Sequence, residues 1–231
     1  MAISQMTALS GVERWWPWVG VAAAVLLIIA TWAVQFQVGE DELDEGGAVL
    51  LEDLDSGSNE VIWRVTSGLG YVGVACLIGF AAGLRRYLDL RSGGQSILPL
   101  IIFAALLVTA GAMVVAWSFR AQVFDGIDSY AADPSSHVTI NRLSQDTGLS
   151  AWPGMAAATA AAALSAFRPG LFPRWLGWLS LVATLLIVVM VMVGGAFPAN
   201  IPAAIWLLAV SIWTVTQVGR EGGPAADTRP A

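Results

Sequence analysis

Six long stretches of this sequence contain no Asp, Glu, Lys, Arg or His, and this feature constrains the fold more than any other. A helix rises about 1.5 Å per residue, so about 20 apolar residues cross the roughly 30 Å hydrocarbon layer of a membrane. The sequence therefore predicts an all-α fold, a polytopic membrane helix bundle with six transmembrane helices. The expected spans are residues 17–36, 65–84, 97–119, 150–167, 175–197 and 201–218, within one transmembrane domain over residues 1–218.

The composition agrees with this class and excludes several kinds of chemistry. Hydrophobic residues make up 57% of the chain and charged residues 12%, against about 25% charged in soluble domains. Cys76 is the single cysteine, which excludes an intrachain disulfide and a zinc site built from several thiolates. The absence of lysine excludes Schiff-base chemistry on a lysine side chain. We expect no cofactor.

The arginines predict the orientation, because cytoplasmic loops of membrane proteins retain positive charge. With both termini cytoplasmic, only three arginines lie outside, namely Arg64, Arg120 and Arg142. The eight cytoplasmic ones are then Arg14, Arg85, Arg86, Arg91, Arg168, Arg174, Arg220 and Arg229. The prediction is a multi-pass protein of the cell membrane with a disordered cytoplasmic tail at residues 219–231.

The N-terminal apolar stretch has an alternative interpretation as a cleaved signal peptide, because "TWA" at residues 31–33 resembles a small-residue processing site. Its apolar run of about 20 residues is longer than the roughly 7 to 15 of a signal peptide. A retained first helix is the preferred interpretation.

The expected extracytoplasmic loop over residues 37–64 is strongly acidic: residues 39–60 carry nine carboxylates and no basic side chain. An EF-hand loop needs glycine at its sixth position and glutamate at its twelfth. Counted from Asp53, those positions hold Ser58 and Arg64. We therefore expect a solvated acidic segment, with weak attraction of divalent cations or a cationic partner as the alternative.

The second outer loop predicts a short extracytoplasmic surface helix. Asp133 is suited to the N-cap, Pro134 to the first turn and Gly148 to the C-terminal end. His137 lies four residues after Asp133, which would place both on one face. Two ligands do not make a metal site, so no metal is expected there.

Charged residues near the outer ends of the spans form a candidate cluster. The outer arginines Arg64, Arg120 and Arg142 are expected to form ion pairs with three nearby acids, Asp125, Asp128 and Asp146. Low dielectric near the membrane strengthens such pairs. A structural cap on the bundle is expected, and binding of an anion or a substrate is the alternative.

Small residues recur every four positions in two of the spans, which lets helix backbones approach closely. The candidate packing residues are Ala75, Gly79 and Gly83 in the second span, and Gly154, Ala158, Ala162 and Ala166 in the fourth. Packing within the bundle is the preferred interpretation, with a dimer face as the alternative.

The stretch "LFPRWLGWLS", residues 171–180, resembles a set of six-span bacterial membrane proteins that are grouped as families of unknown function. In these, a Pro-Arg-Trp-Leu-Gly-like stretch often opens the penultimate helix. The resemblance covers at most residues 97–217, and it implies fold and location only.

The chain has no GxSxG, HExxH or Walker motif and no basic patch, so neither catalytic residues nor nucleic-acid binding is expected. A non-enzymatic structural, accessory or regulatory component is predicted, whose partners are the lipid bilayer and a membrane protein or a second copy. The alternative is a passive carrier or binding protein for a neutral or lipid-like molecule, with an outer vestibule. The polar groups available to a carrier are hydroxyls, such as Thr109, Thr159, Ser165, Thr184 and Ser211. A tunnel of roughly 300 Å³ would favour the carrier, and a closed bundle would favour the accessory component.

Overall fold

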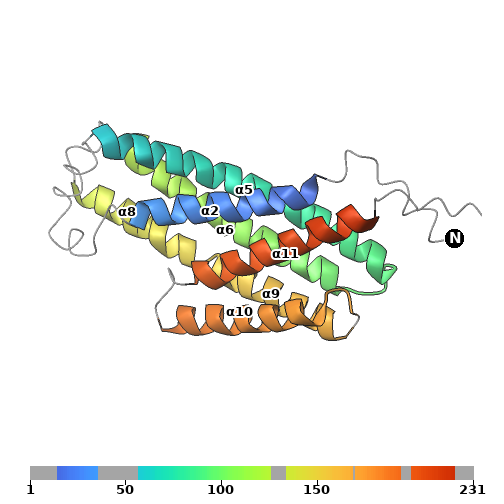
Figure 1. Ribbon diagram of the computed structural model, residues 1–231. Helices are drawn as coiled ribbons and strands as arrows, with labels where there is room; N and C mark the ends of the chain where they lie inside the picture. Colours follow the sequence, from blue (N-terminus) through green and yellow to red (C-terminus); the bar gives the residue numbers. More distant parts are fainter. Residues whose placement is uncertain (1–14, 36–56, 126–133, 169, 194–198, 222–231) are drawn as a thin grey trace, which may run out of the picture.

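The computed structural model describes residues 15–35, 57–125, 134–168, 170–193 and 199–221, and in these ranges every regular element is a helix. The helices lie side by side in an elongated bundle (Figure 1). The predicted all-α membrane helix bundle is confirmed. In chain order the helices are α2 (Trp16–Gln35), α5 (Gly57–Ser92), α6 (Leu98–Asp125), α8 (Pro134–Leu149), α9 (Trp152–Phe167), α10 (Arg174–Met192) and α11 (Asn200–Glu221).

Four of these helices are long and apolar enough to cross a membrane. Their apolar stretches are Val61–Ser92, Leu98–Gln122, Arg174–Met192 and Asn200–Gly219. Helix α2 is apolar but shorter in its described part, and α9 has only 16 residues. Ten residues of α9 are buried, so this helix is enclosed by its neighbours and depends on them for its environment.

Helices α5 and α6 extend beyond the spans expected from hydropathy. Helix α5 begins at Gly57 rather than at residue 65, so residues 57–64 form its first turns instead of the end of the acidic loop. It continues to Ser92, where Gly93 and Gly94 adopt positive φ and end it. At about 1.5 Å per residue, its 36 residues measure about 54 Å. Polar residues at both ends of α5 therefore project past a hydrocarbon layer of about 30 Å.

Helix α2 packs along α5 through glycines of α5. A Cβ atom on Gly83 would lie 2.4 Å from the Trp16 ring, and one on Gly79 would lie 3.6 Å from Val19. A Cβ atom on Gly73 would lie 3.0 Å from the Leu27 side chain. Ala75, the third member of the predicted stripe, is exposed. The α2–α5 contact thus uses Gly73, Gly79 and Gly83.

The small-residue stripe of α9 lies inside the bundle. Gly154 lies against α6, where an added Cβ would be 2.7 Å from the Ala105 carbonyl oxygen and 2.6 Å from the Thr109 hydroxyl. Ala158, Ala162 and Ala166 are all buried. Ala166 also meets Gly177 of α10, where an added Cβ would lie 2.6 Å from it. One small-residue helix therefore packs closely against both α6 and α10.

Helix α8 covers the predicted surface helix, beginning at Pro134 and ending one residue after Gly148. It packs along the later turns of α6, where the Ser144 hydroxyl donates to the Ala116 carbonyl at 3.0 Å. Helices α8 and α9 follow one another along the bundle (Figure 1). Together they accompany α6 over most of its length, which encloses the end of α6 that carries Arg120.

Candidate functional site

An arginine in contact with two tryptophan rings is the most unusual polar feature of the described bundle. Trp117 and Arg120 are three residues apart on α6, so they share one face of the helix. The Arg120 guanidinium carbon lies 4.2 Å from the ring centroid of Trp63, on α5, and 5.0 Å from that of Trp117. We name Trp63, Trp117 and Arg120 the Arg120 cluster. Both ring contacts are within the range of cation–π attraction.

The Arg120 cluster is almost completely buried. Exposed fractions are 8% for Arg120, 2% for Trp63 and 7% for Trp117. Among the described residues, Arg120 Nε and Nη2 have no hydrogen-bond partner. A buried donor without an acceptor loses its hydrogen bonds to water and forms no others. This costs about 1–3 kcal/mol of folding free energy, and more when the group is charged. Such a group calls for a functional explanation.

Local packing fixes the Trp117 ring, one of the two that contact the guanidinium. The Trp117 indole lies over Gly70 of α5, where a Cβ would come within 2.5 Å of a ring carbon. Only glycine leaves room for the ring at this distance. One turn before Gly70, the Thr66 hydroxyl donates to the Trp63 carbonyl at 3.0 Å. The buried Ser67 hydroxyl on the same helix also has no described partner.

The other members of the predicted ion-pair cluster have different positions. Arg64 on α5 and Arg142 on α8 are exposed, and each has an interaction partner. Asp125 is the last residue of α6 and Asp146 lies in α8, but their side chains are outside the described set, as is the whole of Asp128. Ion pairing between these arginines and acids therefore stays a prediction.

Trp63 and Trp117 were not among the predicted partners of Arg120. The spacing of Trp117 and Arg120 was an available signal, since residues three apart on a helix are neighbours. Trp63 gave no such signal, because its position opposite α6 depends on how far α5 extends beyond its apolar stretch.

A second group of arginines and aromatic rings lies at the opposite end of α5 and α6. Arg91 Nη1 donates to the Tyr87 hydroxyl at 3.0 Å, and its guanidinium carbon lies 5.8 Å from the Trp213 ring centroid. Arg85 lies over the Phe103 ring at 5.1 Å and 3.5 Å from the Asp89 carboxylate. These residues, Arg85, Tyr87, Asp89, Arg91, Phe103 and Trp213, are the Arg91 cluster.

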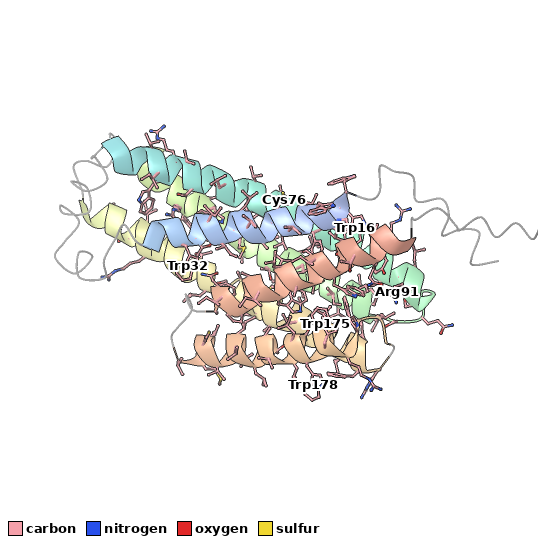
Figure 2. All side chains as sticks on the ribbon, viewed as in Figure 1. Trp16, Trp32, Cys76, Arg91, Trp175 and Trp178 are labelled. Atoms are coloured by element: carbon pink, nitrogen blue, oxygen red, sulfur yellow. The ribbon has the colours of Figure 1, made fainter. Side chains whose placement is uncertain are left out.

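Tryptophans mark both ends of the bundle, as expected at the two interfaces of a membrane. Trp16, Trp175 and Trp178 lie toward the end that holds Arg91, and Trp32 lies toward the other (Figure 2). Trp175 and Trp178 are more than half exposed on α10. Their exposed apolar rings suit contact with lipid.

The interior hydroxyls that a carrier would use are bonded to their own helices. Thr109, Thr159, Ser165, Thr184 and Ser211 each lie within hydrogen-bonding distance of the carbonyl four residues earlier. Two interhelical contacts add to these. Trp206 Nε1 donates to the Ser180 hydroxyl at 2.8 Å, and the Thr159 and Thr184 hydroxyls are 2.8 Å apart. The polar groups thus join α9, α10 and α11 instead of lining an open path.

A cavity of about 40 Å³ lies between α2, α5, α6, α9 and α11. Its walls are mostly apolar, and its polar contributors are Thr31, Thr109 and Asn200. The two threonine hydroxyls already donate to the carbonyls of Leu27 and Ala105, at 2.7 and 3.1 Å. This space holds roughly one or two water molecules. It is far below the roughly 300–1,000 Å³ of ordinary small-molecule sites.

Within the part of the chain that is described, no group of three His, Cys, Asp or Glu side chains is placed to hold a metal ion. Comparison of the sequence and fold with protein-family models, curated proteins and solved structures finds no match to this chain. Functional inference therefore depends on the geometry of the bundle itself.

Proposed function

We propose that this chain is a non-enzymatic, multi-pass component of the cell membrane with a structural, accessory or regulatory role. It acts by binding another membrane protein or a second copy of itself within the lipid bilayer. The observation that carries the proposal is the lack of room for a cargo in the described cavity. The five interior hydroxyls that a carrier could use are bonded to their own helices, and the cavity between α2 and α11 measures about 40 Å³. A chain with this interior meets its partners through its outer surface.

The proposed topology has six crossings, with both termini in the cytoplasm. Two facts support it. Arginines concentrate near the end that holds Arg91, and cytoplasmic ends of membrane helices are rich in arginine. The apolar helices also alternate in direction along the bundle (Figure 1). In this topology the Arg120 cluster faces the extracytoplasmic side.

The alternative, a passive carrier for a neutral or lipid-like molecule, needs a cavity large enough for its cargo. The cavity between α2 and α11 is several times too small for that use. The hydroxyls available to a carrier are occupied by carbonyls of their own helices. These two observations favour the accessory component.

Site-specific photocrosslinking in living cells tests the proposal. A benzoylphenylalanine is placed at Val72 of α5, Val108 of α6 or Leu185 of α10, which are 53%, 58% and 57% exposed. The control position is Phe172, which is 3% exposed and already aromatic. We expect a discrete protein adduct from at least one exposed position and none from Phe172.

A liposome assay tests the alternative, a passive carrier. The purified protein is reconstituted, and efflux of small neutral solutes is compared with that from protein-free vesicles. Equal efflux together with a protein adduct supports the accessory component. Protein-dependent efflux with only lipid adducts at all three exposed positions would overturn the proposal in favour of a carrier.

A further inference from the structure

We propose that Arg120 forms an oxyanion-binding site that takes one phosphate group, supplied by a lipid headgroup or by a free phosphate. This inference is independent of the proposed function, because it concerns a ligand and not a protein partner. It starts from the two unpartnered nitrogens, Nε and Nη2, of a side chain that is only 8% exposed.

The two unpartnered nitrogens lie on the same edge of the guanidinium. Their N–H bonds are parallel and match the spacing of two oxygens of one phosphate or carboxylate, which is the two-pronged geometry that arginine makes with oxyanions. The two buried donors without a partner are thus the pair that binds an oxyanion side-on.

Two aromatic rings hold the guanidinium in place. The ring centroids of Trp63 and Trp117 lie 4.2 and 5.0 Å from its central carbon, and the edge formed by Nε and Nη2 keeps no hydrogen-bond partner. Each nitrogen of that edge is buried. Low dielectric strengthens the attraction between the guanidinium and an anion that reaches it. A side chain must move to admit the anion, so we expect slow association.

The position of Arg120 along α6 favours phosphate over other oxyanions. Arg120 lies two residues before the end of the apolar stretch Leu98–Gln122. It lies 22 residues after Leu98, which corresponds to about 33 Å along the helix. A hydrocarbon layer is about 30 Å thick. Arg120 therefore lies at the depth of the phosphates at a membrane surface.

The first experiment uses full-length protein in a zwitterionic detergent and inorganic phosphate as the probe. The thermal unfolding midpoint is followed during titration with phosphate, against sodium chloride at equal ionic strength. The variant Arg120→Lys keeps the charge but loses the two-pronged edge, and Arg142→Lys on exposed α8 is the matched control. We expect about tenfold weaker phosphate binding for Arg120→Lys, and a change within about twofold for Arg142→Lys.

The second experiment distinguishes lipid from free phosphate. The same three proteins are extracted from membranes that contain phosphatidylglycerol, and native mass spectrometry counts the lipids that remain bound. A retained phosphatidylglycerol that Arg120→Lys loses and Arg142→Lys keeps would identify the headgroup as the source. Phosphate stabilisation without a retained lipid would identify the free ion. Both results support the site.

A third measurement needs no variant and covers the case in which Arg120→Lys does not fold. In wild-type protein labelled with ¹⁵N-arginine, phosphate or short-chain phosphatidylglycerol should shift one Nε–H resonance in a saturable manner. The proposal is overturned if neither probe shifts a resonance. It is equally overturned if Arg120→Lys binds as tightly as wild type, or if a double-mutant cycle couples Arg120→Ala to Asp125→Ala, since a carboxylate of the chain would then hold the edge.

Discussion

The Arg120 and Arg91 clusters both combine arginine with aromatic rings, and they lie at opposite ends of the α5–α6 pair, but the surroundings of the two arginines differ. Arg91 is exposed and donates to the Tyr87 hydroxyl, and Arg85 is within 3.5 Å of the Asp89 carboxylate. Both arginine side chains are exposed enough to be hydrated. Arg120 is 8% exposed, contacts two rings and leaves two donors without a described acceptor.

This difference distinguishes an interfacial anchor, the Arg91 cluster, from a candidate binding site, the Arg120 cluster. An exposed arginine beside aromatic rings is a common feature of a membrane interface, where the ring meets lipid and the charge meets water. A buried arginine with a vacant edge gains no such hydration, so its presence is unfavourable unless an anion arrives. The Arg91 cluster is explained by location alone, and the Arg120 cluster is not.

The largest expected effect comes from removing a ring of the Arg120 cluster. Trp63→Ala removes a side chain that is 2% exposed, and we expect a loss of about 3–5 kcal/mol in the free energy of unfolding. Trp178→Ala, at a position that is 60% exposed, should cost less than about 1 kcal/mol. Unfolding by titrated denaturing detergent measures both. Equal losses would contradict the buried position of Trp63.

Glycine substitutions compare the packing at the two ends. Gly70→Ala pushes the buried Trp117 ring, and Gly83→Ala pushes the half-buried Trp16 ring, each from about 2.5 Å. We expect Gly70→Ala to cost about 1–3 kcal/mol and Gly83→Ala less, because Trp16 has room to move outward. Gly68→Ala, with no atom within 4 Å, is the control and should be neutral or slightly stabilising. Equal losses would show that the two ends are packed alike, and a larger loss for Gly83→Ala would contradict the tighter packing of Trp117.

The smallest expected effect is that of Arg120→Met, measured without added phosphate. The variant loses two cation–π contacts but no longer buries an unpartnered charge, so we expect a net change of about 0–1 kcal/mol in the free energy of unfolding. Arg91→Met should lose a similar small amount, since the Arg91 side chain itself is exposed to water, which weakens its contacts with the Tyr87 and Trp213 rings. A loss above about 3 kcal/mol for Arg120→Met would mean that the chain itself supplies a strong partner.

The sequence predicts the helical class well, because uncharged apolar stretches allow few other folds. It predicts the ends of the helices less well, since α5 continues through polar residues that a hydropathy criterion leaves outside the membrane span. The predicted stripe from Gly154 to Ala166 is buried. In α5, however, Ala75 is exposed, and Gly73 takes its predicted place in the contact with α2. Small residues that recur every four positions indicate one face of a helix, but they do not indicate which neighbouring helix packs against that face. For the same reason Arg120 was identified as a candidate, but its partner Trp63 was not.

Cysteine labelling in intact cells tests most directly whether the Arg120 and Arg91 clusters lie on opposite sides of a membrane. In a Cys76→Ser background, single cysteines are introduced by Ser56→Cys, Ser92→Cys and Ser135→Cys. Ser92 ends α5 beside the Arg91 cluster, Ser135 lies in the first turn of α8, and Ser56 comes directly before Gly57, the first residue of α5, in the sequence. We predict that an impermeant maleimide labels positions 56 and 135 and leaves position 92 unlabelled until the cells are opened. Labelling of position 92, with positions 56 and 135 protected, would contradict the proposed orientation.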